Sequence, residues 1–176
     1  FLHGATVAHG LQGILAKFGR AADVSRVYIF ENEIDPHDGL LTSLRHEWVA
    51  QGISAQLEDP VLHRLSYAEM GFQRWAHLLK RGMAVFGRVL EFPESEQAFL
   101  LRQSIQALVV APIFVDDLWW GFIGFDDCTE ARRWSSMEID ALYTAGNIIG
   151  AALRRKRNEE RISTLSREML KAQDYE

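Results

Sequence analysis

The sequence predicts an α+β protein in which helices flank a mostly antiparallel sheet. Two apolar segments, residues 107–115 and 118–127, are joined by the turn Asp116-Asp117, which predicts two paired strands at the centre of the sheet. The elements follow one another in the order helix, two strands, helix, strand, helix, two strands and helix. The last helical pattern continues unbroken over residues 135–174, so this helix would be about 58 Å long and would extend beyond the domain.

In the first half of the chain, the residue pattern predicts a helix followed by a hairpin. Residues 1–19 have apolar side chains at helical spacing, and Gly19 is a plausible end for that helix. Residues 25–33 and 41–49 are rich in β-branched and aromatic residues, and a turn containing Asp35-Pro36 separates them. Residues 50–65 show no clear period and are predicted to form a loop.

In the middle of the chain, the residue pattern predicts two short helices with a strand between them. Residues 72–81 place Trp75 on an apolar helix face, and residues 83–89 follow as a strand. Pro93 and the acidic residues after it suit the first turn of the second helix, which buries Phe99. In the strand 107–115, Pro112 lacks an N–H group, so it should lie where the hydrogen-bonded ladder is open or at a bulge.

Composition limits the setting of the chain and its partners. The 176 residues suit one domain with an appended element, and the net charge of -5 gives no general attraction to nucleic acid or anionic membranes. The single cysteine and the lack of Asn-x-Ser/Thr sites fit a cytoplasmic location. No apolar run is long enough to span a membrane, so no membrane contact is expected. The chain begins with Phe1 and ends in a helical pattern, and we therefore expect a piece of a longer polypeptide.

Residues 74–155 resemble the GAF family, and more narrowly the GAF domains of bacterial sensor histidine kinases and cyclic-di-GMP signalling proteins. The resemblance extends more weakly back to about Val7. The residues that carry it are Arg74-Trp75, Gly82, Phe92-Pro93, Val109-Val110-Ala111-Pro112-Ile113, Trp119-Trp120-Gly121-Phe122-Ile123-Gly124-Phe125-Asp126-Asp127, Arg133-Trp134-Ser135 and Glu138-Ile139. The sheet core is the most specific part of this set.

The resemblance implies a sensory domain over residues 1–153 and a coiled-coil linker helix over residues 154–176 that leads to an output domain. One sheet face would pack on the terminal helices, and the other would cover a pocket for an unknown small molecule. Strand alternation puts Trp119, Gly121, Ile123 and Phe125 on the face opposite the pocket. The candidate ligand-binding residues are Trp75, Phe99, Trp120, Phe122, Gly124 and Asp126. Gly121 and Gly124 should leave space where a helix or ligand approaches the sheet, and Asp126 should anchor the ligand at the rim.

The sequence holds no arrangement that predicts catalysis, so we expect a non-enzymatic domain. The adjacent carboxylates Asp126 and Asp127 should point to opposite sheet faces and cannot form an acid/base pair. The histidines lack metal-site spacing, so no metal is expected. Cys128 lacks the adjacent His of bilin-binding relatives, so no covalent bilin is expected, and the family's cyclic-nucleotide signature is also missing. The basic run 154–157 is followed by Glu159 and Glu160, which indicates a solvated helix face and no nucleic-acid partner.

Three functions remain to be compared. The first is ligand sensing with a signal passed along the last helix, and the second is a ligand-free structural dimerisation module. The third is a small-molecule enzyme like the sulfoxide reductases that share this fold, but these rely on several cysteines and this chain has one. A cavity of about 300 Å³ or more, with a few convergent polar groups, would favour sensing over the structural module.

The long helix carries two apolar stripes about 100° apart. The first ends at Leu153 and should pack on the sheet: Ile139, Leu142, Gly146, Ile149 and Leu153. The second keeps heptad spacing and should pack on a partner chain: Ile148, Ala151, Arg155, Asn158, Ile162, Leu165, Met169 and Ala172. The apolar half of the second stripe begins at Ile162, which predicts a homodimer held by a parallel two-helix stalk through Ile162, Leu165 and Met169.

Overall fold

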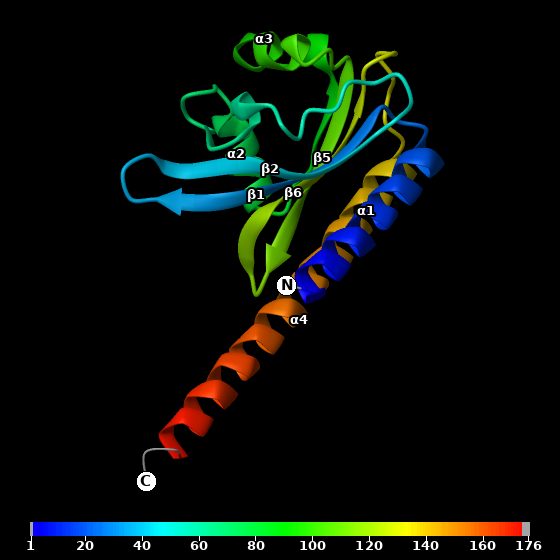
Figure 1. The fold of residues 1–176 in the computed structure, drawn as a ribbon. Coiled ribbons are helices and arrows are strands. Elements are labelled where there is room, and N and C mark those ends of the chain that lie inside the picture. The colour runs from blue at the N-terminus through cyan, green and yellow to red at the C-terminus, as the bar shows by residue number, and fades with distance from the viewer. Residues whose placement is uncertain (1, 174–176) are drawn as a thin grey trace.

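The computed structural model describes residues 2–173, and it describes the side chains of residues 9–173. A six-stranded antiparallel sheet in the order β3-β2-β1-β6-β5-β4 forms its centre, which confirms the predicted α+β fold class (Figure 1). Residue 1 and residues 174–176, which the predicted domain and linker ranges include, lie outside the described residues.

The observed elements follow the predicted order closely. The strands are β1 (Arg26–Asp35), β2 (Gly39–Val49), β3 (Leu65–Ser66), β4 (Val85–Arg88), β5 (Ala107–Val115) and β6 (Leu118–Asp127). The helices are α1 (Leu2–Ala22), α2 (Gln73–Lys80), α3 (Glu94–Arg102) and α4 (Ser136–Gln173), with 3₁₀ turns η1 (Pro60–Leu62) and η2 (Val89–Glu91). The predicted loop at residues 50–65 is only partly irregular, because it contains η1 and the first residue of β3.

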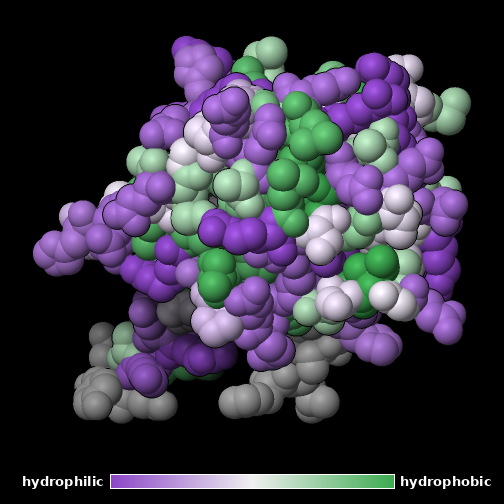
Figure 2. All heavy atoms as spheres, turned by 90° about the horizontal axis from the view of Figure 1, so that it is seen from above, coloured by the Kyte–Doolittle hydropathy of each residue, from purple (hydrophilic) through white to green (hydrophobic). Residues whose placement is uncertain are grey.

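The two faces of the sheet have separate cores. On one face, α1 packs on β1 and β2, while α4 packs on β5 and β6 (Figure 1). On the other face, α2 and α3 cover an aromatic cluster. Seen from above, the surface is mainly hydrophilic, with a short band of hydrophobic side chains near its middle (Figure 2). The sheet is therefore covered by terminal helices on one face and by the two short helices on the other.

The central hairpin confirms the prediction that residues 107–115 and 118–127 are paired neighbours. β5 and β6 run antiparallel, with Val109 opposite Phe125. Asp116 and Asp117 both have positive φ angles, of 50° and 63°, as a two-residue hairpin turn of type I′ requires. β4 pairs with β5 only as far as Val110, so Pro112 lies beyond the end of β4, where its missing N–H group is tolerated.

Gly19 does not end the first helix, and that prediction was wrong. α1 continues to Ala22, and a Cβ atom at position 19 would overlap the ring of Trp48 on β2. The glycine is therefore explained by close packing of α1 on the sheet, because a side chain there would push the helix away from Trp48.

The long helix begins as its sequence predicts. Ser135 and Glu138 form a capping box, in which the Glu138 N–H donates to Ser135 Oγ (3.2 Å) and the Ser135 N–H donates to Glu138 Oε2 (2.8 Å). The first apolar stripe packs on the sheet as expected, with Leu142 and Ile149 fully buried. Among the described residues, no helix combines the length and the apolar composition that a membrane span requires.

Candidate ligand-binding site

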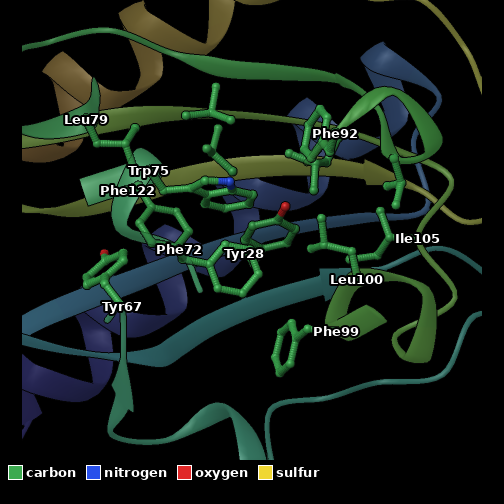
Figure 3. Close-up of a cluster of buried hydrophobic side chains, with 14 of the residues drawn as sticks. Tyr28, Tyr67, Phe72, Trp75, Leu79, Phe92, Phe99, Leu100, Ile105 and Phe122 are labelled. Carbon is green, nitrogen blue, oxygen red and sulfur yellow. The ribbon is translucent and has the colours of Figure 1, made fainter. Parts of the chain in front are cut away.

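A pocket lies between the sheet and the short helices α2 and α3. Its walls come from β1, β2, β5, β6, both helices and the segment that connects β2 to α2. Seven of the twenty residues that line it are aromatic, and the rings of Tyr28, Phe72 and Trp75 lie near one another in the buried cluster (Figure 3). The pocket therefore lies on the sheet face that the family resemblance implied, opposite the terminal helices.

The structure brings four of the six candidate ligand residues to this pocket. Trp75, Phe99, Phe122 and Asp126 line it. Gly124 lies on the same sheet face, opposite Tyr28 in the β1–β6 register, but behind the pocket wall.

Trp120 does not lie on the pocket face, so the predicted alternation was wrong at this end of β6. Ile113 pairs with Gly121 and Phe114 pairs with Trp119, so Trp120 is the extra residue of a β-bulge. The bulge reverses the alternation. Trp119 consequently packs with the aromatic cluster and contacts Tyr67, while Trp120 packs with the core beneath the terminal helices.

The two glycines of β6 make room for the neighbouring strand and not for a helix or a ligand. A Cβ atom at Gly124 would overlap the ring of Tyr28, and a Cβ atom at Gly121 would overlap the carbonyl oxygen of Phe30. Gly124 thus affects the pocket through Tyr28, because it leaves room for this ring beside β6 as part of the pocket wall.

A buried carboxylate joins the two helices that cover the pocket. Glu96 on α3 is 1% exposed and accepts two hydrogen bonds from the Arg74 guanidinium on α2, at 2.8 and 2.9 Å. Its Oε2 also accepts a hydrogen bond of 3.0 Å from the indole N–H of Trp75. This network fixes Trp75 against the pocket and gives the adjacent residues Arg74 and Trp75 a shared partner.

The polar end of the pocket is built around a buried ion pair. Arg26 on β1 pairs with Asp126 on β6 at 3.1 Å, and it also donates to the carbonyl oxygens of Gln103 and Ser54. Asp126 is 1% exposed and belongs to the pocket wall, so its expected position at the rim was wrong. Burial raises the pKa of Asp126 to about 6, even though the charge of Arg26 acts in the opposite direction.

A second carboxylate, Glu47 on β2, also faces this end of the pocket. Its Oε1 accepts hydrogen bonds from the backbone N–H groups of Gln56 (2.7 Å) and Leu57 (3.2 Å). Its Oε2 is buried and has no hydrogen-bond partner among the described residues. Arg26 and Glu47 were not predicted as site residues, although charged residues inside apolar strand segments are a visible signal for a polar site.

The free volume of the pocket is about 80 Å³. This is smaller than the roughly 300 Å³ set as the criterion for sensing, so the size of the pocket taken alone favours the ligand-free module. The second part of that criterion, convergent polar groups, is met by Glu47, Asp126, Gln56 and Gln103 in the pocket wall.

Cys128 and Asp127 lie just beyond the polar end of the pocket. Burial raises the pKa of the Cys128 thiol to about 11, which disfavours the thiolate that a reactive cysteine needs. Asp127 accepts hydrogen bonds from Thr129 and from the Glu130 N–H, on the other side of the strand from Asp126. The two adjacent carboxylates therefore have separate structural partners, as strand alternation predicts.

The fold and the pocket together define an α+β sensory-type domain, with one sheet face on terminal helices and a small pocket on the other. The chain belongs to the GAF domain family, whose match extends over residues 9–153. It is 40% identical over 144 residues to the methanogenesis regulatory histidine kinase FilI of Methanothrix harundinacea (strain 6Ac). That match covers 82% of this chain and 16% of the kinase, so the chain corresponds to a small part of that protein.

Solved structures of GAF domains have the same fold at low sequence identity. The blue-light-absorbing form of the PixJ GAF domain from Thermosynechococcus elongatus superposes with a TM-score of 0.72 at 19% identity, covering 89% of this chain and 90% of that one. The photoproduct state of GAF3 from Slr1393 of Synechocystis sp. PCC6803 gives 0.70 at 21% identity, covering 90% and 98%. These similarities establish the arrangement of helices and strands.

Proposed function

We propose that this chain is the sensory domain of a cytoplasmic regulatory histidine kinase and binds a small molecule non-covalently in the aromatic pocket. The similarity to a regulatory histidine kinase supports the parent protein. In this proposal the domain performs no catalysis of its own, and the signal passes through α4 to a covalently linked output domain.

The proposal that the domain binds a ligand rests on one observation, the group of charged side chains buried beside an aromatic cavity. Buried ion pairs are often no more stabilising than apolar residues of the same size. A domain that only had to fold and dimerise could fill this region with apolar side chains. Arg26, Asp126 and Glu47 are better explained by recognition of a polar ligand group.

The ligand-free dimerisation module remains a second candidate because the free volume is small. Co-purification separates the two candidates, since a bound molecule should be detected by native mass spectrometry of the purified protein. Leu65→Trp should fill the pocket from β3 and remove that molecule. Leu118→Trp, at an exposed position outside the pocket, is the matched control and should retain it. A wild-type protein that carries no molecule and binds none from a metabolite library would support the ligand-free module.

The proposed route for the signal is a parallel two-helix stalk in a homodimer. The second stripe of α4 is exposed at Ile162 (65%), Leu165 (58%) and Met169 (70%). Their heptad spacing suits pairing with the same helix of a second copy, and Arg155 and Asn158 would set the register where the stripe changes from polar to apolar. Two apolar heptads are marginal for a stalk, so the dimer should be weak in isolation.

Sedimentation of the 176-residue chain and of altered chains tests the stalk. Leu165→Asp should shift the protein towards monomer, and so should truncation after Arg157. Leu170→Asp makes the same change one residue beyond Met169, off the stripe but equally exposed, and should leave the dimer intact. Unchanged sedimentation of Leu165→Asp would contradict the stalk as the dimer contact.

A further inference from the structure

Only one of the two carboxylate oxygens of Glu47 accepts hydrogen bonds from the described residues. The residue is 8% exposed, and the backbone of the segment after β2 fixes Oε1. Oε2 accepts no hydrogen bond from any described residue. A buried carboxylate oxygen without a donor is costly for the folded state, so such an atom in a pocket wall indicates that something else donates to it.

The charge balance of the pocket wall favours a cation. Two carboxylates, Glu47 and Asp126, belong to the wall, and no basic side chain does among the described residues that line it. Arg26 neutralises Asp126 from behind the wall. Glu47 has no ion-pair partner within residues 9–173, so the pocket retains one negative charge in a surrounding of low dielectric constant. An anionic ligand would be repelled there.

The remaining wall suits a cation that carries alkyl groups. Seven aromatic rings line the pocket: Tyr28, Phe30, Tyr67, Phe72, Trp75, Phe99 and Phe122. Phe72 and Trp75 meet edge to face with ring centres 4.9 Å apart, and Phe30 stacks on Phe122 at 4.8 Å. Aromatic faces attract ammonium groups, and the attraction is strongest where the cation loses its water. The alkyl groups would bury apolar surface against the same rings.

The size of the cavity restricts the ligand further. A free volume of about 80 Å³ is well below the roughly 300 Å³ at the lower end of ligand pockets. In this form of the domain the pocket therefore suits a small ligand.

We infer that the pocket binds a small alkylammonium ion, whose N–H group donates to Glu47 Oε2 and whose alkyl groups contact the aromatic walls. The inference rests on the proposed function, because it names the ligand class of the same pocket. It assigns Glu47 as the residue that determines specificity.

Isothermal titration calorimetry with four probes of similar size tests the inference on the full 176-residue chain. Trimethylammonium supplies both charge and an N–H group, tetramethylammonium supplies charge alone, isobutyrate is an anion, and isobutanol is neutral. Trimethylammonium should bind the wild type most tightly. Glu47→Gln keeps the shape and the acceptor for the Gln56 and Leu57 N–H groups, but it should weaken trimethylammonium binding at least about tenfold, as expected for a lost charged hydrogen bond.

Two further variants make the result specific. Glu58→Gln makes the same change at an exposed position of the same segment and should bind trimethylammonium like the wild type. Glu47→Asp keeps the charge, but its shorter side chain places the carboxylate farther from the ligand. The affinity of this variant for trimethylammonium should therefore lie between those of the wild type and Glu47→Gln. Thermal melts show whether each variant is folded, and the Asp variant provides the test if the Gln variant does not fold.

Several outcomes would overturn the inference. If isobutyrate or isobutanol binds, and Leu65→Trp blocks it, the amine assignment fails while the sensing pocket stands. If tetramethylammonium binds as tightly as trimethylammonium and Glu47→Gln weakens neither, Glu47 is not the acceptor. If none of the four probes binds, the amine class is excluded, and the native mass spectrum then decides separately whether the pocket holds any ligand.

Discussion

Removing the carboxylate of Glu96 should destabilise the domain strongly, because this group holds α2 and α3 together over the pocket. In Glu96→Ala the indole N–H of Trp75 loses its acceptor in a buried position, which costs about 1–3 kcal/mol. The lost side chain leaves a small cavity that adds about 1–2 kcal/mol. The Arg74 guanidinium contributes less, because its side chain is 39% exposed and can be solvated. We therefore expect a loss of about 3 kcal/mol in the free energy of unfolding.

Urea unfolding followed by tryptophan fluorescence measures this loss. In a chain of this length each kcal/mol lowers the melting temperature by about 2–4 °C, so Glu96→Ala should melt about 6–12 °C lower. Glu31→Ala is the matched control, because Glu31 also pairs with an arginine, Arg45, but both side chains are exposed. The control should lose less than about 1 kcal/mol. Equal losses in the two variants would refute the view that Glu96 holds the covering helices in place.

Two further predictions concern the pocket wall. Gly124→Ala should displace the Tyr28 ring, lower the free energy of unfolding by about 1–3 kcal/mol and weaken ligand binding. Gly121→Ala should be more destabilising, because its Cβ atom meets a backbone oxygen that cannot turn away. Urea unfolding of both variants gives the order of the two losses, and the reverse order would contradict this account. For Asp126, the folded-state pKa of about 6 lies above the ordinary 3.8, so the native state holds a proton between these values that the unfolded chain has released. This contribution to the free energy of unfolding is present below pH 4, and at about 1.4 kcal/mol per pKa unit it amounts to about 3 kcal/mol, which is lost as the pH rises to about 6. Unfolding free energies at pH 4, 5, 6 and 7 should show this fall in the wild type and a flatter profile in Asp126→Asn. Parallel profiles in the two proteins would refute the prediction.

The sequence predicts most of the fold because its signals are local or strongly periodic. The β5–β6 hairpin has apolar residues on both faces and a two-residue aspartate turn, so its pairing can be inferred from the strands alone. The capping box of Ser135 and Glu138 is defined by a spacing of three residues. The first stripe of α4 keeps its phase as far as Leu153, and the structure packs that stripe on the sheet.

The errors arise where a neighbour in space decides the outcome. A bulge between β5 and β6 moves Trp119 to the pocket face and Trp120 away from it, and a single strand carries no sign of the register of its partner. Gly19 resembles a helix end until Trp48 is placed against it. The role of Gly124 depends in the same way on Tyr28, which is 96 residues earlier in the chain.

The polar end of the pocket was the harder part to predict, because its meaning depends on pairing between distant segments. Arg26 and Asp126 are 100 residues apart and meet only because β1 and β6 are neighbours in the sheet. Glu47 is even less evident from sequence, since its importance lies in one oxygen that the fold leaves without a donor. Charged residues inside apolar strands can be found by inspection, but their partners require the sheet order.

The geometry also restricts how a change in the pocket could reach α4, since only one layer of sheet separates the two. Phe122 lines the pocket, and its neighbour in β6, Ile123, is buried on the opposite face and packs beneath α4. At Gly146 a Cβ atom would lie 2.9 Å from the carbonyl oxygen of Pro112, and at Gly150 it would overlap that of Phe114. The helix backbone thus rests directly on β5 and cannot move closer to it. If a displacement of Phe122 moved α4, turning or sliding along the sheet would be open to the helix, and these are the motions that the proposed paired-helix stalk could pass on to an output domain.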